Sequence, residues 1–337
     1  MKPDNRQPNF QNLLDVLHKK TPSRPTLFEF FLNERLERNI IGEEKYKAMG
    51  EYERMVQSFY LAGFDYATIP ITKQRIVPED APREQTISLN AGHFIHDRQS
   101  FEAFTWPNPD EGDMAEFATV GAMLPEGMKV IIYGPGGVLE NTIALVGYEN
   151  LCMMLYDDPD LAKDIFDKVG STLLRMYEIA IQYGFVGALI ANDDWGYNTQ
   201  TMLSPADLRR YVFPWHKRIV ALAHSKGCPA ILHSCGYYGD IIEDIIMDMS
   251  FDARHSYEDN IIPVERAYEQ LKGRIAVLGG IDVDFMVTAS EDAIYQRAKS
   301  LVEMGNGGGY ALGTGNSIAP YIPDAHYFAM TRAVLEI

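Results

Sequence analysis

The fold is decided by residues 185–235, which read in succession FVGALIANDD (Phe185–Asp194), SPADLRRYVFPWHKRIVALAHSKG (Ser204–Gly227) and PAILHSC (Pro229–Cys235). The two outer stretches are short apolar runs, which is typical of buried strands. The middle stretch opens with Ser204 as a helix N-cap and Pro205 at the first helical position, and it closes at Gly227 as a C-cap. This segment therefore predicts a strand, a helix and a second strand parallel to the first.

The same alternation extends along the whole chain. Helical patterns with one apolar face separate the strand-like runs, as in Asp160–Tyr183 and in Ser290–Met304 with its serine cap and Gly305 as the stop. The apolar runs number eight: Pro25–Phe31, Asp65–Ile71, Lys129–Gly134, Phe185–Asp194, Pro229–Cys235, Phe251–Glu258, Arg274–Asp282 and Gly309–Asn316. Eight strands that alternate with helices predict an α/β fold, a (β/α)8 TIM barrel. A doubly wound sheet is the alternative, but it leaves unexplained why each run ends in polar or glycine residues.

Two further features are expected around this barrel. The segment between Thr72 and Pro125 is longer than a strand-to-helix connection needs, so we expect an insertion after the second strand that covers the barrel mouth. It contains Asn90, His93, His96, Arg98 and Trp106. The first twenty or so residues are expected to form an N-terminal helical cap on the base of the barrel. Without a repeat or a linker, residues 1–337 are expected to form a single domain.

Composition restricts the class of function. The chain has 337 residues, a formal net charge of -17, 46% hydrophobic residues and three cysteines. Such an acidic chain repels phosphate backbones, so we expect no nucleic-acid partner. An odd and small number of cysteines argues against a disulfide framework. No signal peptide or membrane-crossing stretch is visible, so we expect a cytoplasmic protein without a membrane partner.

Metal-ligand residue types gather where the predicted strands end, and the strongest pattern is His233-Ser-Cys235-Gly236. Residues i and i+2 of a strand face the same side, so an imidazole nitrogen and a thiolate can converge on one ion. Both are good zinc ligands, and a catalytic zinc usually has three protein ligands and one open position. A buried histidine beside an inert core cysteine is the structural alternative.

The third ligand is expected to be oxygen or nitrogen. Cys152 lies in a helical stretch, and Cys228 sits at the base of its strand, roughly 20 Å from Cys235 at about 3.3 Å per residue. Asp193 and Asp194 are adjacent and point to opposite faces, so at most one of them faces the barrel axis unless the strand has already ended. The candidates from the residues alone are Glu29, Asp193, Asp194, His255 and Glu258. We assign Glu29 to the metal with His233 and Cys235, and we assign catalytic roles to Asp194, Glu258 and Asn316.

Several of these stretches together resemble the uroporphyrinogen decarboxylase superfamily: ILHSCG, SYEDN, GGID and GTGNSIAPYIPDA. The resemblance spans nearly the whole chain and implies a TIM barrel. Its decarboxylases carry an arginine-rich RQAGRY-type motif near the first strand and an aspartate after the second. Here the first region reads PTLFEFFLNERLERN, and the second strand ends Ile69-Pro70-Ile71-Thr72. The chain therefore departs from the decarboxylase pattern at both places.

The zinc- and corrinoid-dependent methyltransferase branch is the better match. Its ligands include a His-x-Cys at the fifth strand, which corresponds to His233 and Cys235. Its thiol-specific members usually have a further cysteine near the eighth strand, where this chain has Asn316. The resemblance therefore implies a zinc-dependent methyltransferase with an oxygen substrate, such as a methoxylated aromatic. The corrinoid would arrive on a separate carrier protein, because the chain has no DxHxxG motif.

Two other functions stay open at this point. A lyase of the uroporphyrinogen decarboxylase type, acting on a carboxylated substrate, needs cations at the mouth, and the candidates are Lys73, Arg75, Arg98 and Arg254. A barrel that only binds a ligand is the third interpretation. A small-molecule methyl donor or acceptor, the carrier protein and a second copy in a homodimer are the expected partners.

Overall fold

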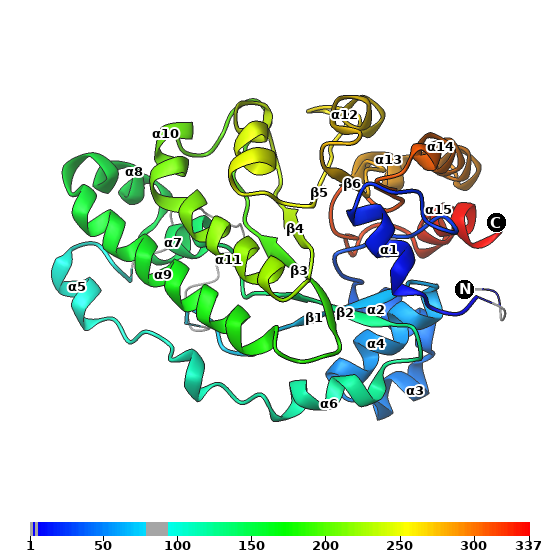
Figure 1. The fold of residues 1–337 in the computed structure, drawn as a ribbon, viewed down its shortest axis with the longest axis horizontal. Coiled ribbons are helices and arrows are strands. Elements are labelled where there is room, and N and C mark those ends of the chain that lie inside the picture. The colour runs from blue at the N-terminus through cyan, green and yellow to red at the C-terminus, as the bar shows by residue number, and fades with distance from the viewer. Residues whose placement is uncertain (1–2, 4–5, 79–93) are drawn as a thin grey trace.

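Seven parallel strands form one sheet, and their spatial order is their order in the chain (Figure 1). This computed structural model describes residue 3 and residues 6–78 and 94–337. The strands are β1 (Tyr66–Pro70), β2 (Lys129–Tyr133), β3 (Val186–Asn192), β4 (Ala230–His233), β5 (Ala253–His255), β6 (Ala276–Leu278) and β7 (Tyr310–Ala311). Each lies inside one of the predicted runs, which confirms an α/β fold with an all-parallel sheet.

The first predicted strand differs from the expectation. Residues 25–31 join β7 through a single parallel bridge between Leu27 and Leu312. On the other side, the hydroxyl of Tyr66 accepts a hydrogen bond from the Glu29 N–H and donates one to the Glu29 carbonyl, both at 2.8 Å. A tyrosine side chain from β1 thus satisfies backbone groups that a neighbouring strand would otherwise pair. The described residues therefore contain seven hydrogen-bonded strands, and the eighth run is held beside β7 without becoming a regular strand.

Helices connect the strands, as a parallel sheet requires. Between β2 and β5 they are α7 (Val138–Val146), α8 (Tyr148–Asp157), α9 (Pro159–Ala180), α10 (Pro205–Asp207), η2 (Leu208–Val212), α11 (Phe213–Ser225), η3 (Gly239–Ile241) and η4 (Asp244–Asp248). After β5 they are α12 (Val264–Leu271), α13 (Val283–Thr288), α14 (Glu291–Met304), η5 (Gly305–Gly307) and α15 (Asp324–Leu335).

The predicted helix signals are confirmed in three places. Helix α9 buries Leu161, Ile165, Val169, Leu173, Met176 and Ala180 on one face. Helix α14 starts after its N-cap Ser290 and is followed by Gly305. Ser204 caps α10, but the helix that follows contains a π-helical turn, η2, before Pro214. Because proline lacks an N–H and crowds the preceding turn, the widened turn lets the helix continue past it.

In the described part of the chain before β1 there are four helices: α1 (Phe10–Leu17), α2 (Glu34–Ile41), α3 (Glu43–Ala48) and α4 (Glu51–Ala62). The Phe10 N–H donates to the carbonyl of Gly127, two residues before β2, so α1 lies near the amino-terminal ends of the strands. This position is where a cap on the base was expected. Both chain ends lie on the same side of the molecule (Figure 1), in keeping with the bridge between Leu27 and Leu312.

The segment between β1 and β2 contains α5 (Arg98–Ala103), η1 (Pro109–Glu111) and α6 (Ala115–Met123). Arg98 pairs with Asp164, and Asp110 pairs with Arg175, so residues 98–110 follow the outer side of α9 (Figure 1). This part of the expected insertion therefore packs against a helix instead of covering the mouth. Residues 79–93, which include Asn90 and His93, lie outside the described residues.

The buried hydrophobic side chains of the described residues, from Phe10 to Leu335, form one continuous cluster. It is made of the strands and of the helix faces that cover them, and it holds the carboxyl ends of the strands in fixed positions. Among the described helices, none combines the length and apolar character that crossing a bilayer requires.

Candidate metal centre

Three side chains with metal-ligand atoms meet at the carboxyl ends of β3 and β4. The ligand atoms of Asp194, His233 and Cys235 all lie within 4.8 Å of one another. Sγ of Cys235 is 3.8 Å from Nε2 of His233, and Asp194 Oδ1 accepts a hydrogen bond of 2.7 Å from the Cys235 N–H. His233 is the last residue of β4, and Asp194 lies two residues after the end of β3. Cys235 lies two residues past the end of β4, and its sulfur lies on the same side as the His233 ring, as predicted.

These three donors fit a tetrahedral zinc ion. Bonds of about 2.0–2.3 Å to a tetrahedral ion place two ligand atoms about 3.5 Å apart, close to the observed 3.8 Å between sulfur and nitrogen. Burial raises the pKa of the Cys235 thiol to about 12, with a further contribution from Asp194, and burial also raises the pKa of Asp194. Two anions, a thiolate and a carboxylate, are unfavourable side by side in this buried site. A cation that binds between them compensates their charge and displaces their protons.

The sulfur of Cys235 also accepts two hydrogen bonds. Asn316 donates through Nδ2 at 3.2 Å, and Ser256 donates through Oγ at 3.5 Å. The Ser317 N–H donates to Asn316 Oδ1 at 2.7 Å, which fixes the amide with its nitrogen toward the sulfur. Ser256 has a φ of 84°, in the region that favours glycine, and such strain gathers at functional sites. Asn316, which we predicted to be catalytic, is therefore a hydrogen-bonding neighbour of the candidate ligand Cys235.

A second histidine stands behind His233. Nδ1 of His233 lies 2.7 Å from Nδ1 of His255, and both side chains are buried. Burial, and secondarily the positive charges nearby, lowers the pKa of His233 well below its usual range, and burial lowers the pKa of His255 to about 3. The two rings are therefore neutral, which is the form in which imidazole binds metal.

Glu29 lies apart from the three donors. Its Oε1 accepts the Thr314 N–H at 2.9 Å, and its Oε2 is 2.7 Å from the Thr314 hydroxyl, which also contacts the carbonyl of Asn316. The Thr314 hydroxyl has one proton, so it can donate either to Glu29 Oε2 or to the Asn316 carbonyl, but not to both. Burial raises the pKa of Glu29 to about 8, so near neutrality the carboxyl group itself carries the second proton. Geometry thus favours Asp194 over Glu29 as the third ligand.

Asp193 points away from the cluster, as expected for the neighbour of Asp194. Its carboxylate accepts the N–H groups of Leu139 and Glu140, both at 3.0 Å, in the first turn of α7. It also lies 2.8 Å from Nε2 of His216. Gly137 is needed beside it, since a Cβ at this position would lie 2.1 Å from the Asp193 carboxyl carbon. The glycine-rich turn therefore permits a close approach between a helix start and a strand end.

The candidate acid Glu258 is half-buried, and burial raises its pKa, with a smaller contribution from Asp282. Arg254, a predicted mouth cation, is fully buried. Its guanidinium donates to the carbonyls of Ser256 and Ser234 at 2.5 and 2.8 Å. The ring of Tyr238 lies 3.8 Å from it. Arg254 therefore holds the backbone around Cys235 and is not free for a substrate.

Ser256 and the structural role of His255 were not predicted from the sequence. The available signal was their position: both stand at the end of the sixth predicted run, where the other site residues were sought. That position could not show that the Ser256 backbone turns its hydroxyl toward a sulfur on the neighbouring strand.

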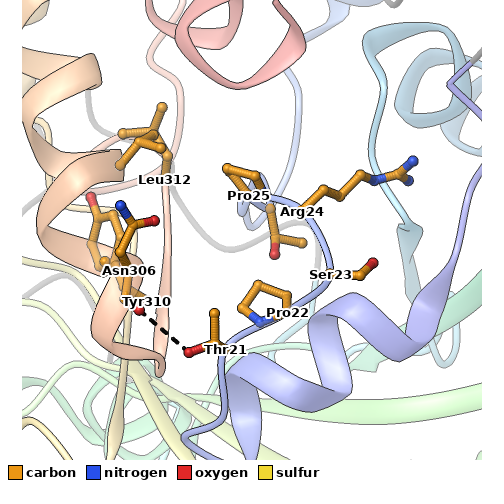
Figure 2. A pocket seen from close by; sticks show the side chains of 11 residues that line it. Thr21, Pro22, Ser23, Arg24, Pro25, Asn306, Tyr310 and Leu312 are labelled. Atoms are coloured by element: carbon orange, nitrogen blue, oxygen red, sulfur yellow. Dashed lines mark hydrogen bonds between the residues drawn. The ribbon is translucent and has the colours of Figure 1, made fainter. Parts of the chain in front are cut away.

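A cavity of about 170 Å³ lies elsewhere (Figure 2). Its lining includes Thr21 to Thr26, which lead into and begin the first run, and Tyr310, the first residue of β7. It therefore lies at the amino-terminal ends of the strands, away from the candidate metal centre. In barrels of this kind that end serves stability, and the chemistry belongs to the other end.

Fold and site together define the class: an α/β barrel-type protein with a candidate catalytic metal centre at the carboxyl ends of its strands. A profile described as "Uroporphyrinogen decarboxylase (URO-D)" matches residues 94–337. The chain belongs to the uroporphyrinogen decarboxylase family, which confirms the resemblance drawn from its motifs.

Curated relatives carry the same name. A uroporphyrinogen decarboxylase of Anaeromyxobacter sp. (strain Fw109-5) is 29% identical over 189 residues, covering 56% of this chain and 51% of that protein. One of Geobacter sulfurreducens is 22% identical over 257 residues, covering 72% and 71%. The chain thus spans about half the length of the first curated relatives it matches.

Among solved structures, a methyltransferase from Methanosarcina mazei superposes with a TM-score of 0.70. The match covers 98% of this chain and 99% of that one at 15% sequence identity. At this identity the likeness shows a shared fold.

Proposed function

We propose that the protein is a zinc-dependent methyltransferase that moves a methyl group between a small oxygen-containing substrate and a corrinoid. The corrinoid is supplied by a separate carrier protein in the cytoplasm. The observation that carries this proposal is the convergence of Asp194, His233 and Cys235 within 4.8 Å at the carboxyl ends of the strands. The fold shared with a methyltransferase supports it.

In this proposal Asp194, His233 and Cys235 would hold the zinc, and three protein ligands are the set that is typical of a catalytic zinc. When bound, zinc supplies a Lewis acid for the substrate oxygen, and the corrinoid supplies the cobalt that carries the methyl group. The protein orients the substrate and fixes the charge around the site. Asn316 and Ser256 withdraw electron density from the sulfur through their hydrogen bonds, which favours a harder, oxygen-binding centre. We propose that Glu258 exchanges a proton with the substrate.

Decarboxylation of a carboxylated substrate is the second candidate, because the curated relatives are named uroporphyrinogen decarboxylases. That reaction needs cations free to hold several carboxylates. Of the candidate cations, Arg254 is buried against backbone carbonyls, Lys73 pairs with Glu116 and Glu51, and Arg98 pairs with Asp164. These three cations are already paired with groups of the protein, which supports the methyltransferase over the lyase.

The test uses the purified protein in three assays. It is incubated with cob(I)alamin and a panel of methoxylated aromatics, with methylcobalamin and thiols, and with uroporphyrinogen. The proposal expects methylcobalamin to form in the first assay, seen in the cobalamin spectrum, and to be lost in Cys235→Ala. Transfer to thiols alone would keep the reaction class and overturn the oxygen substrate. Decarboxylation without methyl transfer would overturn the proposal.

A further inference from the structure

The contact between His233 and His255 contains one proton, and its position decides which nitrogen of His233 is free. The two Nδ1 atoms are 2.7 Å apart, so one of them donates and the other accepts. Phe30 packs on the His233 ring with centroids 4.8 Å apart, and Phe28 packs on the His255 ring at 5.0 Å. These aromatic contacts fix both rings in place, and the choice of tautomer then depends on their remaining nitrogens.

The outer nitrogen of His255 faces an atom that can only accept. Nε2 of His255 lies 3.3 Å from the carbonyl oxygen of Thr314, so this nitrogen carries a proton. The same oxygen accepts the Gly280 N–H at 3.0 Å, and Glu29 holds the Thr314 N–H at 2.9 Å. Gly279, with a φ of 74°, leaves room here, because a Cβ would lie 2.2 Å from that oxygen. The acceptor of the His255 proton is thus anchored on both sides.

His255 is fully buried, its two ring nitrogens contact His233 and the Thr314 carbonyl, and it follows the cationic Arg254 in the chain. A second proton on its ring would put an uncompensated charge in the interior, so His255 is neutral with its one proton on Nε2. Its Nδ1 must therefore accept, and Nδ1 of His233 must donate. The neutral His233 then has a bare Nε2, and Nε2 is the nitrogen that lies 3.8 Å from Cys235 Sγ.

We propose that His255 is a positioning residue that fixes the tautomer of His233, so that the lone pair of Nε2 points into the cluster with Asp194 and Cys235 before any ion arrives. Glu29 contributes indirectly, because it binds the N–H of Thr314, whose carbonyl accepts the His255 proton. An outer partner of this kind orients a ligating histidine and increases its basicity, and its loss commonly costs about 10–100-fold in metal affinity. Only this consequence for affinity rests on the proposed function; the tautomer follows from the contacts alone.

The first experiment reads the tautomer directly in metal-free protein. Long-range proton–nitrogen NMR correlations of histidine labelled with nitrogen-15 distinguish a ring protonated on Nδ1 from one protonated on Nε2, and His233→Gln assigns the signal. We expect His233 to carry its proton on Nδ1 and His255 on Nε2. A proton on Nε2 of His233 in the unchanged protein would overturn the inference, whatever the protein binds.

The second experiment compares His255→Leu with His255→Asn. Leucine removes the acceptor, while Oδ1 of asparagine can take the place of Nδ1. We expect the leucine variant to lose the single His233 tautomer and about 10–100-fold in affinity for Co²⁺, measured by competition with a chromophoric chelator, and the asparagine variant to retain both. His326→Leu, in which a histidine bonded to the Met286 carbonyl is lost, is the control and should change neither.

The outcomes separate the two proposals. An unchanged tautomer and affinity in a folded His255→Leu variant would overturn the role of His255. Should that variant fail to fold, the tautomer of the unchanged protein and the affinity of His255→Asn still decide the question. The expected tautomer in a protein that binds no Co²⁺ or Zn²⁺ would support the inference and refute the proposed metal function.

Discussion

Nδ2 of Asn316 lies 3.2 Å from Sγ of Cys235, although the two residues are 81 positions apart in the chain. The Ser317 N–H holds the other end of the amide, so the nitrogen and not the oxygen faces the sulfur. An amide N–H stabilises negative charge on the sulfur and reduces how much of that charge reaches a bound cation. Asn316 therefore contributes to the site as a hydrogen-bond donor.

The first prediction concerns Asn316→Ala. Without the donor, the sulfur gives more charge to the metal, and the centre becomes a weaker Lewis acid. We expect the zinc content to stay the same, and kcat/KM for demethylation of a methoxylated aromatic to fall about tenfold, or about 1.4 kcal/mol. Elemental analysis and steady-state kinetics check this. Loss of zinc in this variant would instead make Asn316 a ligand.

The second prediction concerns the ligand set. Protein purified without chelators should contain about one zinc per chain, as a single site with three ligands implies. His233→Ala, Cys235→Ala and Asp194→Ala should each lose it, while Glu29→Gln should keep it, because Glu29 is bound to Thr314. Elemental analysis of the unchanged protein and these variants decides the set. Zinc retained in Asp194→Ala and lost in Glu29→Gln would restore Glu29 as the third ligand.

The third prediction concerns pH. Burial raises the pKa of Glu29 from 4.5 to about 8, so between these values the folded protein holds a proton that the unfolded chain has released. The contribution of Glu29 to stability is thus present at low pH and is lost as pH rises toward 8 and above, by at most about 1.4 kcal/mol per pH unit. In Glu29→Gln, whose amide can both donate and accept here, this loss should vanish.

Urea unfolding of both proteins between pH 5 and 9 measures the effect. The free energy of unfolding of the unchanged protein, minus that of Glu29→Gln, should fall as pH rises from 5 and level off above about 8. A difference that is flat or rises with pH would show that Glu29 is ionised in the folded protein.

The fourth prediction concerns the close approach of Gly137 to Asp193. A Cβ at Gly137 would lie 2.1 Å from the Asp193 carboxyl carbon, so Gly137→Ala must displace either the start of α7 or the end of β3. We expect the free energy of unfolding to fall by about 1–3 kcal/mol. Gly184→Ala is the matched control, since a Cβ at Gly184 would meet no atom within 4 Å, and it should change stability by less than about 0.5 kcal/mol. Equal melting temperatures for the two variants would contradict this.

Much of the architecture was predictable because it depends on local patterns. Apolar runs and caps such as Ser204 and Ser290 act over a few residues, and they predicted the seven strands and the main helices within a few positions. The pairing of His233 with Cys235 was predictable for the same reason, since side chains of an extended chain repeat every two residues, although β4 itself ends at His233. The first run does not form a regular strand, because the hydroxyl of Tyr66 forms the hydrogen bonds with Glu29 that the backbone of a neighbouring strand was expected to form.

The carboxylate that joins His233 and Cys235 in the cluster was not predictable in this way. Glu29 and Asp194 are both carboxylates at the end of an apolar run, and nothing local distinguishes them. Glu29 meets Thr314 from 285 residues away, and Asp194 meets the N–H of Cys235 from the next strand. Which carboxylate reaches the cluster depends on how neighbouring strands end and turn, and this is set by packing across the sheet.

Short-range periodicity and contiguous motifs in the sequence were enough to predict the α/β class, the family and the pairing of His233 with Cys235. Three features became visible only in the tertiary structure. Asp194 joins His233 and Cys235, and Asn316 and Ser256 donate hydrogen bonds to the Cys235 sulfur. Nδ1 of His255 contacts Nδ1 of His233. Each of these contacts joins residues from different strands, and its geometry depends on strand register and on the buried surroundings that fix protons and charges. Neither the strand register nor the buried surroundings can be deduced from the residues next to each position in the sequence.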